Sequence, residues 1–265
     1  ISFKSQNLVD MKHILITILV VLLVGCASRS TQATSVSGQQ KHLTMPIKNR
    51  LLIPSNDGQQ GVATDGEFIY VQNTHQLFKY RLNGQLLVKG PRLKLHHGGI
   101  VFVKGRIYAA VSGCEPNGSD EHFVHVYDAT SLELIGVHDV RKHFTVCAGG
   151  IAHRDGHFFV AESFFDDDHS DRIVEFDSTF QHIKTHEINF KSPFGIQGLE
   201  YLPGRDQFQV HSHGKAFYRI NGQLENDSLI IGQSGFDLQD LTRLDRKTLI
   251  INHRGTESLE FVEIR

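Results

Sequence analysis

The 265-residue sequence predicts an all-β protein built from similar repeated units, and three observations support this prediction. A turn containing glycine, glutamine or aspartate, followed by an aliphatic residue, recurs five times along the chain. Each recurrence leads into short runs that alternate apolar and polar residues, which is the pattern of half-buried strands. Gly, Asn and Asp turns separate the runs, and no long amphipathic helical pattern appears after residue 25.

An aliphatic residue marks the start of each unit, and successive markers lie 38, 51, 48 and 42 residues apart: Val62, Ile100, Ile151, Leu199 and Leu241. A second and a third run follow each marker, and a turn such as Asn83-Gly84 or Asn221-Gly222 leads to a fourth. Four strands in a unit of about 40–50 residues are typical of propeller blades. The sequence therefore predicts a five-bladed β-propeller of four-stranded antiparallel blades over residues 45–265.

The fifth unit lacks a fourth run, because the sequence ends at Arg265 after the third. Residues 45–54 precede the first unit and have no partner of their own. We expect this N-terminal segment to supply the outer strand of the fifth blade and close the ring, because closure removes unpaired strand edges. A six-bladed propeller with one degenerate blade and an all-β sandwich remain as alternatives.

Composition excludes several classes of protein. Lys and Arg number 27 against 29 Asp and Glu, so the formal net charge is −2 and no basic surface for nucleic acid is expected. Hydrophobic residues make up 40% of the chain, which excludes bulk disorder. Histidine is frequent, at 17 residues, and it is the side chain whose charge changes closest to neutral pH.

The N-terminal part carries a targeting signal. Lys12 and His13 precede the apolar residues 14–24, which are too few to span a bilayer as a helix, and Leu23-Val24-Gly25-Cys26 follows. This ending resembles the lipobox of bacterial lipoproteins. The resemblance implies a signal peptide over residues 11–25, cleavage before Cys26, and a diacylglycerol on the Cys26 thiol. A plain secretory peptide or an uncleaved anchor is the alternative, and residues 1–10 are interpreted as upstream, non-structural sequence.

The residues after Cys26 bear on location. Ala27 stands where an aspartate tends to retain such lipoproteins at the inner membrane, so the resemblance implies an outer-membrane lipid anchor facing the periplasm. Residues 26–44 are polar and lack periodicity, as expected of a flexible tether. We therefore expect the membrane to be a partner through the lipid, with residues 45–265 as the propeller domain.

Polar side chains recur in the loops that precede the first strand of each blade and in those that join the second strand to the third. In a propeller both sets of loops emerge at the same end of the ring. The opposite end offers ordinary tight turns such as Asp65-Gly66 and Asp155-Gly156. We predict that the polar end binds a small polar ligand or a periplasmic protein at a central mouth. The ligand-binding candidates are Gln60, His96, His97, Gln197, His211, Gln239, Asp240 and His253.

Several of these residues have structural alternatives. His96 and His97 could bond to backbone carbonyl groups, and the glutamines at 60, 197 and 239 could bridge neighbouring blades. The acidic residues 166–168 with Asp171 could bind calcium or form a solvated loop, because they lack the glycine and glutamate of an EF-hand.

A metal-dependent hydrolase acting on an ester, lactone, phosphate or glycoside is the alternative function. Its catalytic candidates are His97, Glu162 and Asp240, and its possible divalent metal would be held by His97, His211, His213 and His253. No zinc-type Cys/His signature and no Gly-x-Ser-x-Gly motif accompanies them.

Two cysteines besides Cys26 lie in the predicted propeller. Cys114 and Cys147 fall at the same end of adjacent blades, so a disulfide is geometrically credible in an oxidising compartment. A pair of free thiols is the alternative.

Two strings carry a resemblance to a known group. Gln197-Gly198-Leu199-Glu200-Tyr201 and Asp240-Leu241-Thr242 resemble blade starts of secreted bacterial propellers in the SdiA-regulated and NHL-like group. The resemblance implies a β-propeller and adds little about chemistry. The blade count and the Gln-Gly-Leu string are also similar to five-bladed glutaminyl cyclases. That family uses a glutamate and tryptophans around its pore, whereas this chain has no Trp.

Overall fold

The computed structural model describes residues 47–54, 57–114, 120–165, 169–234, 237–253 and 258–263. The chain divides into two compact units, Ile1–Ser37 and Gly38–Arg265, and all described residues belong to the second. The expected signal peptide (11–25), the lipidation site Cys26, the tether (26–44) and the acidic residues 166–168 lie outside the described residues.

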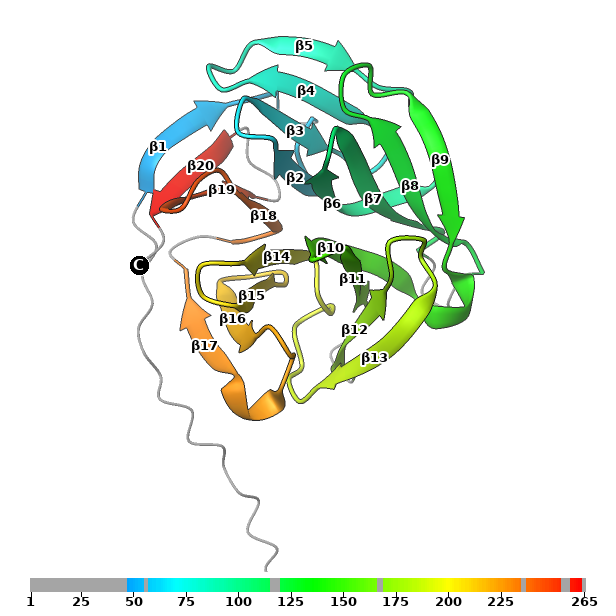
Figure 1. Cartoon of the computed structure of the whole chain (residues 1–265). Coiled ribbons are helices and arrows are strands. Elements are labelled where there is room, and N and C mark those ends of the chain that lie inside the picture. Colours follow the sequence, from blue (N-terminus) through cyan, green and yellow to red (C-terminus); the bar gives the residue numbers. More distant parts are fainter. Residues whose placement is uncertain are drawn as a thin grey trace, which may run out of the picture. The chain divides into compact units, whose positions relative to one another are not determined.

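Five four-stranded antiparallel sheets form the ring of this unit (Figure 1). Blade 1 consists of β2 (Gly61–Thr64), β3 (Phe68–Gln72), β4 (Leu77–Arg81) and β5 (Leu86–Lys89). Blade 2 consists of β6 (His96–Val103), β7 (Arg106–Ser112), β8 (His122–Asp128) and β9 (Leu134–Asp139). Blade 3 consists of β10 (Cys147–Arg154), β11 (His157–Ser163), β12 (Asp171–Phe176) and β13 (His182–Ile188).

Blade 4 consists of β14 (Gly198–Leu202), β15 (Gln207–His211), β16 (Ala216–Asn221) and β17 (Ile230–Gln233). Blade 5 consists of β18 (Asp240–Arg243), β19 (Thr248–Asn252), β20 (Ser258–Glu263) and β1 (Ile47–Leu52). The helices of the described part are two short 3-10 turns, Arg141–His143 and Asn226–Ser228, and neither is long and apolar enough to cross a bilayer. The predicted five-bladed propeller is confirmed, in place of a six-bladed ring or a sandwich.

The N-terminal strand closes the ring. β1 pairs antiparallel with β20, with Leu51 opposite Leu259, and Figure 1 shows the two strands side by side in blue and red. Leu51 packs against the apolar cluster that contains Phe261 and Tyr80. The predicted closure is therefore confirmed, and it gives the third strand of blade 5 a hydrogen-bonded neighbour on its outer side.

The hydrophobic core lies between neighbouring blades. In β15, Phe208 and Val210 belong to the cluster that joins blade 4 to blade 3, where Phe159 packs on Phe208 at 4.7 Å between ring centroids. Gln209, one residue away, points to the other side and contacts Arg219. Because successive side chains of a strand point to opposite faces, the two faces of a blade can pack against two different neighbouring blades.

Glycines let the inner strands approach one another around the axis. A Cβ atom on Gly99 would lie 3.0 Å from the Cα of Gly150, and one on Gly198 would lie 2.8 Å from the Cα of Asp240. These separations are too short for a side chain, so glycine is required where the strands of adjacent blades meet. Asp240 immediately precedes the marker Leu241 in β18, a position that glycine occupies in the other four inner strands.

Candidate functional site

The ring has two ends, which we name by what they carry. At the glutamine end the inner strands β2, β6, β10, β14 and β18 begin, and three predicted site residues meet there. Gln239 Nε2 donates to Gln60 Oε1 at 3.0 Å and lies 3.4 Å from Gln197 Oε1. Gln60 and Gln239 are buried and Gln197 is half-buried. The glutamines therefore bridge blades 4, 5 and 1, which is the structural alternative considered for them.

Asp240 lies buried among the inner strands. Its Oδ2 accepts a hydrogen bond from the backbone N–H of Val62 at 2.9 Å. The N–H groups of Leu241 and Ile100 also stabilise the charged form of this carboxyl group. Burial raises the pKa of Asp240 well above its usual value, against the opposing effect of these N–H groups. Each inner strand has no neighbour within its own blade on the axial side, so its backbone donors need other acceptors. Asp240 supplies one to blades 1 and 2.

His97 is buried between blades. Its Nδ1 lies 3.2 Å from the carbonyl oxygens of both Thr74 and Leu95, and its Nε2 lies 2.8 Å from the Tyr127 hydroxyl. Desolvation by burial lowers the pKa of His97 to about 4, so the ring is neutral at neutral pH. The structure thus places His97 in a satisfied interior position, and His96 is half-buried beside it at the start of β6.

The other candidate histidines point into separate surroundings. His211 is buried, accepts from Gln209 at 3.0 Å and stacks on Phe217, and burial lowers its pKa to about 3. His253 lies 3.8 Å from a carboxylate oxygen of Glu260. His213 packs on Phe194, with ring centroids 5.2 Å apart. Within the described ranges, no group of three or more His, Cys, Asp or Glu side chains could hold a metal ion, so the predicted metal ligands are not brought together.

Glu162 supports the chain next to the disulfide. It is buried, its Oε1 accepts from the N–H of Thr145 at 2.6 Å, and its Oε2 pairs with Arg172. Two residues after Thr145, Cys147 is bonded to Cys114, with their Cα atoms 5.0 Å apart. The predicted disulfide is confirmed, and the interactions of Glu162 fix the segment that carries one of its cysteines.

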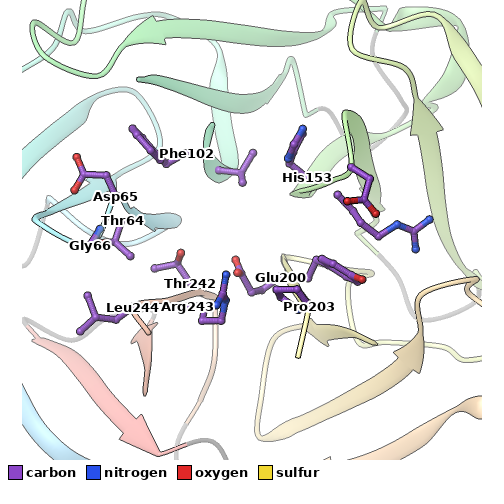
Figure 2. Close-up of a pocket in the computed structure, with 14 residues that line it drawn as sticks. Thr64, Asp65, Gly66, Phe102, His153, Glu200, Pro203, Thr242, Arg243 and Leu244 are labelled. Atoms are coloured by element: carbon purple, nitrogen blue, oxygen red, sulfur yellow. Dashed lines mark hydrogen bonds between the residues drawn. The ribbon is translucent and has the colours of Figure 1, made fainter. Parts of the chain in front are cut away.

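A cavity of about 460 Å³ lies at the other end, where the inner strands finish, and we call this the cavity end. All five blades contribute to its lining, and Figure 2 shows their side chains around one space. One lining residue from each blade, in order, is Thr64, Phe102, His153, Glu200 and Thr242. We expected only ordinary turns at this end, and the turn residues Asp65 and Asp155 are part of the lining.

Glu200 has the most strongly shifted pKa among the residues that line this cavity. Burial raises its pKa to about 8, and the charge and backbone N–H of Arg243 oppose this rise. At neutral pH the carboxyl group is therefore mostly protonated and can donate a hydrogen bond. On the inner strand of the neighbouring blade 3, burial lowers the pKa of His153, with a smaller contribution from Lys104.

Sequence reasoning missed this cavity, although the repeat carried a signal for it. The residues two positions after the aliphatic markers all line it: Thr64, Phe102, His153, Tyr201 and Arg243. Four of these five are polar or titratable, and such residues are seldom fully buried in a core. Comparing marker-plus-two positions across the repeats would have indicated polar side chains at this end of the ring, although not the cavity itself.

Comparison with protein-family models finds no match, and comparison with curated proteins finds none. Solved structures do match. The Myxococcus xanthus glutaminyl cyclase has a TM-score of 0.66 and 10% identity, covering 84% of this chain and 98% of that one. A chain of the mitotic checkpoint complex has a TM-score of 0.52 and 9% identity, covering 85% and 93%. At these identities the similarity shows the β-propeller fold.

Proposed function

We propose that this propeller binds a small polar organic ligand in the axial cavity at the cavity end. The observation that carries the proposal is the lining, because strands from all five blades converge on one cavity of about 460 Å³. Pockets for small molecules generally measure about 300–1,000 Å³ and combine apolar walls with a few polar groups. Candidate polar residues at the glutamine end instead bond mainly to one another or to the backbone.

The lining selects for a ligand with hydroxyl or amide groups. Thr242 offers a hydroxyl group, and protonated Glu200 offers both a donor and an acceptor. Phe102 of blade 2 and Tyr201 of blade 4 add aromatic side chains to the lining. A compact molecule with polar substituents around a flat or cyclic body fits this combination.

Ligand binding can be tested with the wild-type protein and a set of sugars, amino acids and nucleosides, by thermal shift and then calorimetry. We expect at least one compound to bind, and Glu200→Gln with Thr242→Val to weaken it about tenfold or more, as expected for lost hydrogen bonds. Glu133→Gln, at an exposed carboxyl group of blade 2, is the matched control. Equal affinity in all variants would reject this site.

Cyclisation of N-terminal glutamine is a second candidate function. It is supported by similarity to a glutaminyl cyclase over 98% of that chain and by the protonated carboxyl group of Glu200 in the cavity. In that reaction the α-amine attacks the side-chain amide carbon and the C–N bond to the leaving nitrogen breaks. Glu200 would donate a proton to the departing nitrogen, which leaves as ammonia, and its carboxylate would then take the proton that the attacking amine loses. The lack of Trp counts against this function. Incubation with a peptide beginning in glutamine, followed by mass spectrometry, tests it, and no ammonia loss above the Glu200→Gln background rejects it.

For location, we propose a lipid-anchored protein of the bacterial envelope that faces the periplasm. The lipobox ending at Cys26 supports this, and so does the disulfide, because such bonds persist in oxidising compartments. The resemblance to secreted SdiA-regulated and NHL-like propellers agrees with it. Metabolic labelling with a fatty-acid analogue should mark the wild type and not Cys26→Ala, and an unlabelled wild type would contradict the proposal.

A further inference from the structure

Three arginines gather next to the axial cavity, between blades 4 and 5. Arg205, Arg243 and Arg246 line a hollow of about 630 Å³ together with Leu202 and Pro203. Arg243 and Pro203 also line the axial cavity, so the two spaces adjoin. Among the residues that the structure describes, no acidic side chain lines the hollow.

These arginines keep most of their positive charge uncompensated within the described structure, and the carboxyl group on which Arg243 acts, that of Glu200, is mostly protonated at neutral pH. None of the three forms an ion pair with a described acidic residue. The nearest acids in sequence have other partners, since Asp206 accepts from the Tyr201 hydroxyl at 2.8 Å and Asp245 accepts from the N–H of Lys247 at 2.7 Å. Arg243 Nε is buried and has no hydrogen-bond partner. A buried donor without an acceptor is unfavourable.

A fourth arginine adds to the positive charge of this region. Arg219 is buried, and its Nε donates at 2.9 Å to the neutral amide oxygen of Gln209. Burial lowers its pKa to about 10, and repulsion from Arg205 acts in the same direction. Arg219 therefore remains charged at neutral pH and strengthens the positive field at Arg205.

We propose that the hollow binds the oxyanion of a small soluble ligand, a carboxylate or phosphate group, while the rest of that ligand occupies the axial cavity. This proposal rests on the proposed function and specifies its ligand class as a small organic anion. Guanidinium groups match both oxyanions with paired N–H donors, which makes arginine the residue suited to this recognition. The shared lining residue Arg243 would contact the anion at the border of the two spaces.

Inorganic phosphate is the probe, measured by calorimetry at low ionic strength with the folded protein. We expect saturable binding that weakens as salt is added, because the attraction is between charges. The double variant Arg205→Gln/Arg246→Gln changes two exposed side chains and should weaken binding about tenfold or more. Arg106→Gln, at an exposed arginine of blade 2, is the matched control and should bind like the wild type.

Several outcomes with phosphate as the probe would overturn the proposal. These are no phosphate binding at millimolar concentration, equal binding in the double variant, or an equal loss in Arg106→Gln. Arginine-dependent binding to phosphatidylglycerol vesicles without binding to free phosphate would also overturn it, in favour of a lipid headgroup. If an uncharged ligand binds in a Glu200-dependent manner while phosphate does not, the anion proposal fails and the proposed function stands. If neither binds, both fail.

Discussion

Replacing Asp240 with alanine removes the carboxyl group that ties blade 5 to blades 1 and 2. The N–H of Val62 then loses its acceptor at 2.9 Å, and the N–H groups of Ile100 and Leu241 lose a favourable neighbour. An orphaned buried donor costs about 1–3 kcal/mol, so we expect a loss of about 3 kcal/mol after the relief of burying a carboxyl group is included. For a domain of this size, that loss corresponds to a fall of about 6–12 °C in Tm.

Urea denaturation followed by circular dichroism measures the effect, and tyrosine fluorescence is a second probe because the chain has no Trp. Asp240→Asn keeps one acceptor oxygen and should lose less stability than Asp240→Ala. Glu67→Ala, in an exposed turn, should stay within about 0.5 kcal/mol of the wild type. If Asp240→Ala is as stable as Glu67→Ala, the inner-strand donors do not depend on Asp240 and the reasoning is refuted.

The remaining predictions concern closure, protonation and the disulfide. Deleting Ile47–Leu52 exposes the edge of β20, so gel filtration should show self-association and Tm should fall, and a monomer of unchanged Tm would contradict the closing role. The pKa of Glu200 is raised from 4.5 to about 8, so its contribution to the free energy of unfolding is complete below pH 4.5 and is lost as pH rises through 8. Between pH 4.5 and 8 the wild-type protein should therefore lose about 2 kcal/mol more unfolding free energy than Glu200→Gln, after allowance for solvent screening. Urea titrations at several pH values measure this difference, and parallel pH profiles of the two proteins would exclude it. Cys114→Ser/Cys147→Ser should lose about 2–4 kcal/mol in the same titrations, and two thiols reactive in the unreduced, denatured wild type would disprove the bond.

The repeat made the fold predictable. Aliphatic markers, alternating runs and Gly/Asn turns are local features, and each specifies a strand or a turn without reference to distant residues. The segment near Ile47 had no partner in the first unit and the fifth unit had three runs, which predicted the pairing of β1 with β20. The disulfide followed from the same topology, because it placed Cys114 and Cys147 at one end of neighbouring blades.

The site was less predictable, because it depends on where each side chain points. His97 lies just before an irregularity in the pairing of β6 with β7, between His97 and Ile100, and it points to Tyr127 between the blades. The sequence placed His97 and His211 at the same end of the ring. In the structure, however, His97 contacts residues of blades 1 and 2, whereas His211 contacts residues of blade 4. The three glutamines bridge neighbouring blades, which was one of the two alternatives for them. They come together because all three occupy equivalent positions next to the axis.

The sequence by itself determined the number of blades, the strand order, the closing strand and the cysteine pair. These depend on local periodicity and connectivity, which are written along the chain. Only the tertiary structure decided which end holds a cavity, because that depends on how closely five inner strands approach at each end. Glycines, glutamines and Asp240 fill the axis where the strands begin, whereas larger polar residues such as Glu200 and Arg243 surround open space where they finish.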